Sequence, residues 1–149
     1  MKRIICIVMV ILIALSSCKT NIRYSSGRDT VKSYGDGTFQ IGGRNPPGIF
    51  YAGEGSPLIS HVDRYYESSD MVYILGHEED REENIIYGII DTKSNVIQVY
   101  FTEDIYLADR LLESPSIIFL KEFNEFTDNA QEIFNKMAEG AIGKTIKKK

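Results

Sequence analysis

The chain has 149 residues, 43% of them hydrophobic, with nine Tyr and seven Phe, which is enough apolar side chain to fill one core and too much for intrinsic disorder. The formal net charge is −4, and removing residues 1–17, which hold Lys2 and Arg3 but no acid, leaves 15 basic against 21 acidic residues. Because an acidic chain repels phosphate backbones, nucleic acid is excluded as an expected partner.

The first residues carry the signals of protein export. Lys2 and Arg3 precede an unbroken apolar run from Ile4 to Leu15, which is typical of a signal peptide. As a helix, this run spans only about 18 Å, whereas the hydrocarbon layer of a bilayer is about 30 Å thick. We therefore expect cleavage of residues 1–17 rather than a retained membrane span.

The run ends in Leu15-Ser16-Ser17-Cys18, which resembles the lipobox of bacterial lipoproteins. The resemblance implies that the Cys18 thiol receives diacylglycerol, that a peptidase cuts before this cysteine, and that the new amine is acylated, for example with palmitate. Two or three acyl chains suffice for stable anchoring. The resemblance thus implies a place in the cell envelope, attached to the outer membrane or to the outer face of the plasma membrane. The alternatives are an ordinary signal peptide with an incidental Cys18, and an uncut anchor.

Cysteine chemistry is excluded elsewhere in the chain. The second cysteine, Cys6, lies inside the leader, so acylation of Cys18 leaves no free thiol after cleavage. Disulfides, Cys-ligated metals and cysteine nucleophiles are therefore ruled out together.

Residues 18–35 are polar and rich in Ser, Thr and Gly, which predicts a lipidated cysteine followed by a flexible tether. A single domain is expected over residues 36–142, and a frayed basic tail over residues 143–149. Within the domain, strands are predicted where apolar and polar residues alternate or apolar residues run together between turn residues. These segments are residues 38–41, 49–52, 58–66, 71–75, 85–90 and 96–101, the last two forming an antiparallel hairpin around Asp91 to Asn95.

Helical patterns follow the strands. One helix is predicted from Glu103 to Ser114, with Thr102 as its cap, and a second from Thr127 or Asp128 to Gly140. The apolar stripe expected on the second consists of Ala130, Ile133, Phe134, Met137, Ala138 and Ala141. Residues 117–126 remain ambiguous. The order of strands before helices predicts an α+β fold, with an antiparallel meander of about five strands covered on one face by two or three helices.

No motif for catalysis, a metal or a cofactor is evident, so no catalytic, metal or cofactor site is predicted. The only histidines are His61 and His77. A small envelope hydrolase that uses one of them with a carboxylate is the alternative to a non-catalytic protein. Five tyrosines suit either a carbohydrate platform or packing across the sheet, and the absence of Trp favours packing: Tyr65, Tyr66, Tyr73, Tyr87 and Tyr100.

The densest charge lies between two apolar strands, and it consists of Glu78, Glu79, Asp80, Glu82 and Glu83. A solvated hairpin loop is the simplest interpretation. The functional interpretations are a cation site, although the ligand pattern and central glycine of an EF-hand calcium loop are missing, and a contact surface for a basic protein partner. Tyr34 to Ile41 (YGDGTFQI) and Tyr87 to Asn95 (YGIIDTKSN) make the body resemble small uncharacterised bacterial proteins, some of them proposed as toxin-immunity partners. The resemblance implies a membrane-anchored binding or immunity-like module and no catalytic residues.

Overall fold

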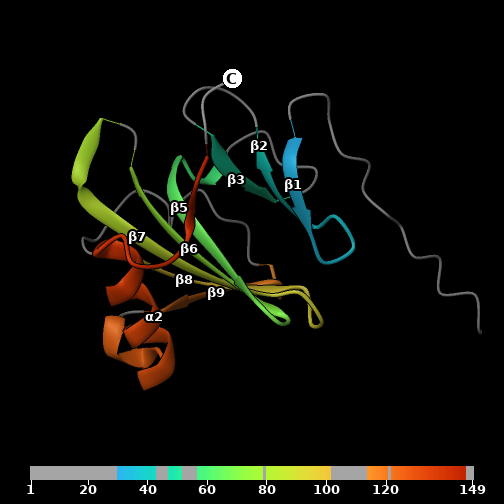
Figure 1. Ribbon diagram of the computed structural model, residues 1–149. Coiled ribbons are helices and arrows are strands. Elements are labelled where there is room, and N and C mark those ends of the chain that lie inside the picture. The colour runs from blue at the N-terminus through green and yellow to red at the C-terminus, as the bar shows by residue number, and fades with distance from the viewer. Residues whose placement is uncertain are drawn as a thin grey trace, which may run out of the picture.

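The computed structural model describes residues 30–42, 47–51, 57–78, 80–101, 114–120 and 122–146 (Figure 1). Strands make up most of this part of the chain. They are β1 (Thr30–Tyr34), β2 (Phe39–Gly42), β3 (Gly48–Tyr51), β4 (Pro57–Ile59), β5 (His61–Ser68), β6 (Met71–Glu78), β7 (Arg81–Asp91), β8 (Val96–Phe101), β9 (Ile117–Leu120) and β10 (Lys144–Thr145). The helical elements described are the 3-10 helix η1 (Phe123–Glu125) and the α-helix α2 (Asp128–Ala138).

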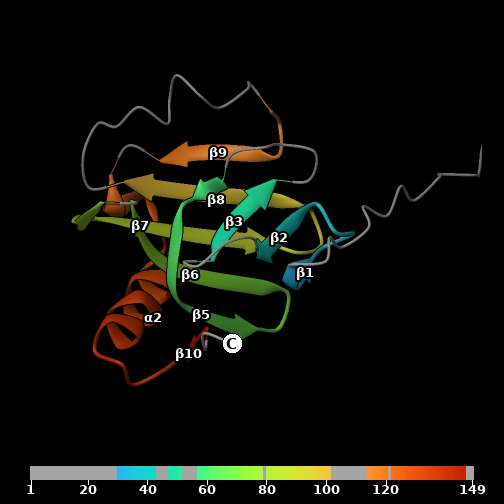
Figure 2. The ribbon, with the colours of Figure 1, turned by 90° about the horizontal axis from the view of Figure 1, so that it is seen from above.

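The strands form two sheets that face each other. One has four strands in the order β1-β2-β3-β4, and the other has six in the order β10-β5-β6-β7-β8-β9. Neighbouring strands are antiparallel except β8 and β9, which are parallel. Only Ser60 separates β4 from β5, so the chain bends there and passes from one sheet to the other (Figure 2).

The main core lies between the two sheets. Phe39, Ile41 and Ile49 of the small sheet are fully buried and meet Ile74 and Ile86 of the large one. Phe39 and Ile41 share a strand face because side chains two apart point the same way. Burial of each such side chain contributes roughly 1.5–3 kcal/mol, so this layer supplies much of the driving force for folding.

A second core lies on the opposite face of the large sheet, under α2. Tyr73 and Ile89 of the sheet pack there against Phe134 and Met137 of the helix. The helix begins at a Thr127 cap, whose side chain accepts a hydrogen bond from the Ala130 N–H at 3.3 Å. Strand β6 is therefore buried on both sides, as its continuous apolar run predicts.

The end of α2 is fixed by a glycine and by an arginine from the sheet. Gly140 has φ of 77°, which closes the helix by turning the chain into the left-handed region. Arg64 of β5 then donates hydrogen bonds to the carbonyl oxygens of Ile142 (3.2 Å) and Gly143 (3.0 Å). These bonds hold the segment after the helix against β5, where β10 pairs with the same strand.

The predicted α+β class is wrong, because strands dominate the described residues and α2 is the one α-helix among them. The second predicted helix is confirmed, although Ala138 and Ala141 of its expected stripe are exposed. The helix predicted from Glu103 to Ser114 falls almost wholly on residues 102–113, which lie outside the described ranges. The ambiguous residues 117–120 form β9, since their backbone pairs with β8.

The predicted domain borders also need correction. Residues 30–34, assigned to the tether, form β1 and pair with β2, and Tyr34 is buried. All side chains of β1 except that of Tyr34 are exposed or partly exposed, which is why the sequence of this segment shows little apolar pattern. At the other end, Lys144 and Thr145 of the predicted tail form β10, and Ile146 packs against the main core.

The hairpin predicted over residues 85–101 is confirmed, since Ile86 pairs with Phe101 and Asp91 with Val96. The Asp91 carboxylate accepts hydrogen bonds from the backbone N–H groups of Lys93 (2.9 Å) and Ser94 (3.2 Å), which fixes the turn. In the described part of the chain, no helix combines the length and the apolar character needed to cross a bilayer.

Candidate functional site

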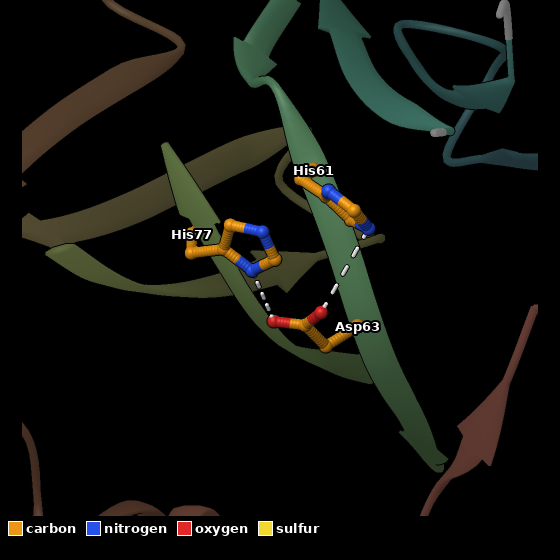
Figure 3. A group of neighbouring side chains, drawn as sticks. All are labelled: His61, Asp63 and His77. Atoms are coloured by element: carbon orange, nitrogen blue, oxygen red, sulfur yellow. Dashed lines mark hydrogen bonds and ion pairs between the residues drawn. The ribbon is translucent and has the colours of Figure 1, made fainter. Parts of the chain in front are cut away.

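Three polar side chains meet on the β5–β6 hairpin, near the bend at which the chain changes sheets. His61 and Asp63 come from β5 and His77 comes from β6 (Figure 3). They lie on the α2-bearing face of the large sheet, because His77 and Leu75 are two residues apart and Leu75 packs against the α2 cluster. We call these three residues the His–Asp–His cluster.

A β-bulge at Asp63 creates this cluster. From the turn outward, Arg64 pairs with Leu75, but Val62 pairs with Gly76, so Asp63 is an extra residue with no partner position in β6. Beyond the bulge, His61 stands directly opposite His77. Without the bulge, a regular hairpin starting from the same turn would place Val62 opposite His77, and His61 would point to the other face of the sheet. The bulge therefore brings both imidazoles and the carboxylate to one side.

The burial of β5 shows the same bulge. Val62 and Tyr65 are both buried in the main core although they are three residues apart, a spacing that places side chains on opposite faces of a regular strand. A regular strand over residues 58–66 would place Ile59, His61, Asp63 and Tyr65 on one face, and this expectation is wrong at both ends. Ile59 belongs to β4 of the other sheet and is buried in the main core, and Tyr65 points into the same core because the extra residue reverses the alternation.

The cluster is compact and partly open to solvent. His77 Nδ1 lies 2.8 Å from Asp63 Oδ2, within hydrogen-bond distance, and His61 Nε2 lies 3.9 Å from Asp63 Oδ1. The two imidazole rings are 4.0 Å apart between centroids and tilted by 34°. The side chain of His77 is 13% exposed, while those of His61 and Asp63 are 33% and 39% exposed.

Gly76 holds the backbone of the cluster at close range. A Cβ at this position would lie 2.2 Å from the carbonyl oxygen of His61 and 2.7 Å from Cγ2 of Ile59. Only glycine therefore lets β6 approach the bend between β4 and β5 so closely. The approach fixes His61 against the strand that carries His77.

This arrangement supports two kinds of chemistry. A carboxylate that accepts a hydrogen bond from one imidazole nitrogen sets the tautomer and leaves the other nitrogen able to accept a proton. Alternatively, two imidazole nitrogens and a carboxylate oxygen are three suitable ligands for a metal ion, and one such atom from each residue lies within 4.8 Å of the others.

The acidic residues predicted as a partner surface lie on the β6–β7 hairpin. The strands extend further than expected, so Glu78 ends β6 while Glu82 and Glu83 belong to β7. Asp80, Glu82 and Glu83 are exposed, and Glu79 lies outside the described residues. The prediction of a solvated hairpin loop is therefore wrong for Glu78, Glu82 and Glu83, which lie in strands, although Glu82 and Glu83 are exposed as expected. Cys18, the predicted lipidation site, also lies outside the described residues.

A buried asparagine supports the acidic hairpin. Asn84 is only 2% exposed, and its side-chain amide donates a hydrogen bond to Glu78 Oε2 at 3.1 Å. A buried amide without a partner is costly, so this contact favours one position for Glu78 at the base of the hairpin.

Another polar group joins the two sheets. Lys32 Nζ and the Tyr34 hydroxyl, both of β1, donate hydrogen bonds to Glu67 Oε1 of β5 at 3.0 and 3.1 Å. The hydrogen bond from Lys32 lowers the pKa of Glu67, and the same bond to the Glu67 carboxylate raises the pKa of Lys32. Burial, reinforced by the Glu67 charge, raises the pKa of the Tyr34 phenol. We interpret this group as structural, because each member is satisfied by another.

The tyrosines favour packing over a carbohydrate platform. Tyr73, Tyr87 and Tyr100 belong to the core under α2, where Tyr73 and Tyr87 pack edge-on against Phe134 at 5.8 and 4.9 Å between centroids. Burial raises the pKa of Tyr87 and of Tyr73. Tyr65 lies in the main core.

Sequence reasoning identified both histidines but missed Asp63 as their partner. The signal was present in the spacing His61-x-Asp63, which places two side chains on one strand face. What the sequence could not supply was the pairing with His77, because that pairing depends on the bulge.

Comparison with known proteins adds no relative. No protein-family model matches this chain, and no curated protein or solved structure is significantly similar to it.

Proposed function

We propose that this protein is a bacterial envelope lipoprotein, attached to the membrane through lipid on Cys18, whose β-rich domain is a non-catalytic binding module for a protein with a basic surface. The anchor rests on the leader and on Leu15-Ser16-Ser17-Cys18. An immunity-like role, in which the partner is a toxin, is one form of this proposal.

The observation that carries the binding role is the acidic β6–β7 hairpin. Asp80 lies in the turn of this hairpin, and Glu82 and Glu83 lie in β7 between the pairs Glu78–Arg81 and His77–Ile85. All three are exposed, and Asn84 holds Glu78 at their base. Charges held on an ordered hairpin keep their mutual geometry, so they can match a fixed pattern of Lys and Arg on a partner. Such exposed charge acts mainly on the rate of encounter.

The test is a charge-neutralised variant, Asp80→Asn with Glu82→Gln and Glu83→Gln, and a control with Glu122, Glu125 and Glu139 changed to Gln. Both remove three exposed acids, so they alter the net charge equally. Asn tolerates the positive φ of 69° at position 80, and the fold should survive. Partners captured by cross-linking in the native envelope would be purified, and their association rates measured at two salt concentrations.

We expect the hairpin variant to associate at least tenfold more slowly at low salt and to lose most of its salt dependence. The control variant should stay within about twofold of the unchanged protein. Equal rates for both variants would remove the acidic hairpin from the interface.

A second candidate function is hydrolysis with His77 as the general base. The 2.8 Å contact between His77 Nδ1 and Asp63 Oδ2 favours it, because a carboxylate that orients an imidazole is a recurrent catalytic arrangement. An ester and peptide substrate panel tests this function. A rate that falls at least a hundredfold in both Asp63→Asn and His77→Gln would support it, and the absence of turnover above background would leave the binding role alone.

A further inference from the structure

We propose that the His–Asp–His cluster binds a divalent transition-metal ion of the zinc class. The proposal depends neither on the lipid anchor nor on the acidic hairpin. It rests on three side chains, from two paired strands, that place one potential ligand atom each within 4.8 Å of the others.

The ligand set selects the class of ion. Two imidazole nitrogens and one carboxylate oxygen suit Zn²⁺, Ni²⁺ or Cu²⁺, whereas Mg²⁺ and Ca²⁺ prefer sites made of oxygen atoms alone. Selectivity therefore comes from His61 and His77, and Asp63 supplies the charge.

The geometry needs only small adjustments to close around an ion. In a tetrahedral zinc site, ligand distances of about 2.0–2.2 Å from the metal place the ligand atoms about 3.3–3.6 Å from one another. His61 Nε2 already lies 3.9 Å from Asp63 Oδ1, and His77 Nδ1 lies 2.8 Å from Asp63 Oδ2. The three ligand atoms lie within 4.8 Å of one another, so shifts of up to about 1.5 Å at the side-chain tips bring them to this spacing.

The backbone that carries the ligands is already in place. His61 and His77 are directly opposite each other in the ladder, the bulge directs Asp63 to the same face, and Gly76 allows the close approach of the strands. Ligands held on paired strands lose less conformational freedom on binding than ligands on loops, which favours affinity. The partial exposure of His61 and Asp63 gives a hydrated ion access.

Three protein ligands leave at least one coordination position for water or for a group from another molecule. Structural zinc sites usually have four protein ligands, whereas open sites have three. This cluster therefore belongs with the open type.

The experiment uses the full chain, purified in non-ionic detergent without a histidine tag, and Zn²⁺ as the probe. Imidazole ¹⁵N resonances are recorded during the titration, and affinity is measured by competition with a chromophoric chelator. His61→Gln, His77→Gln and Asp63→Asn each remove one ligand. Asp70→Asn is the control, because this acid is similarly exposed (41%) and lies in the turn at the other end of the same hairpin.

We expect one equivalent of Zn²⁺ to shift the resonances of both histidines together, and a hundredfold excess of Mg²⁺ to leave them shifted. Each ligand variant should bind Zn²⁺ at least tenfold more weakly. Asp70→Asn should bind within twofold of the unchanged protein.

The proposal would be overturned if the imidazole resonances did not move at about 1 mM Zn²⁺. Equal binding by a folded His61→Gln/His77→Gln double variant, or displacement of Zn²⁺ by Mg²⁺, would overturn it as well. If a variant does not fold, the resonances of the unchanged protein decide the question, because that titration requires no substitution.

Discussion

Replacing Gly76 by Ala tests the close approach of strands on which the His–Asp–His cluster depends. The new Cβ would lie 2.2 Å from a backbone carbonyl oxygen of His61, which cannot rotate away, so β6 and the bend must separate. Overpacking of this kind costs typically about 1–3 kcal/mol, and the contact with backbone places Gly76→Ala at the upper end. Because Ala has less conformational freedom than Gly in the unfolded chain, the substitution also stabilises the fold by about 0.4–1 kcal/mol, which offsets part of this cost. The net expectation is a loss of about 2 kcal/mol.

Gly88→Ala is a matched control on the adjacent strand. Its Cβ would lie 3.2 Å from Cδ1 of Ile59, the end of a flexible side chain, so a shift of a few tenths of an ångström accommodates it. We expect its free energy of unfolding to stay within about 1 kcal/mol of the unchanged protein.

The assay is urea unfolding of the chain from Lys19 onward, followed by circular dichroism. With a denaturant slope of about 2 kcal/mol per molar, Gly76→Ala should lower the midpoint by about 1 M, and Gly88→Ala by less than half of that. Equal midpoints for the two variants would refute the steric argument, and so would Gly76→Ala unfolding at the midpoint of the unchanged protein.

Three further predictions address the anchor, the second core and the link between the sheets. Labelled palmitate should enter the unchanged protein but not Cys18→Ala, and equal labelling of both would contradict the anchor. Phe134→Ala should lower the free energy of unfolding by about 3–5 kcal/mol, since the ring is fully buried under the helix; a loss below about 1 kcal/mol in urea unfolding would contradict that packing. Because burial raises the pKa of Tyr34 above its ordinary value of 10.0, its neutral form stabilises the fold below that pH, and this contribution declines as pH rises further. Tyr34→Phe should therefore lose less stability than the unchanged protein between about pH 9 and 11, whereas parallel pH profiles would contradict this assignment.

Local patterns were enough to predict the elements in which one signal dominates. The strands on either side of Asp91 to Asn95 were predictable because apolar residues border a polar turn, and their pairing follows from the short connection. Helix α2 was predictable because the Thr127 cap precedes residues with helical spacing such as Phe134 and Met137.

The elements that were missed depend on contacts distant in sequence. Strand β1 buries only Tyr34, so its alternation is weak and its strand state comes from pairing with β2. Strand β9 is defined by its parallel pairing with β8, which no local pattern encodes. The His–Asp–His cluster was missed for the same reason, since a one-residue change of register decides which face His61 occupies.

Because Asp63 is the extra residue of the bulge, it can be removed without changing the pairing of the other residues in the hairpin. Deleting this residue joins Val62 to Arg64 and restores a regular ladder, with Val62 still opposite Gly76 and His61 still opposite His77. The loss of a single codon would therefore remove the carboxylate while both imidazoles and the buried Val62 and Tyr65 keep their places. By the same reasoning, insertion of one codon into a regular hairpin of this kind is enough to add an acid beside a cross-strand pair of histidines, with no substitution in the core.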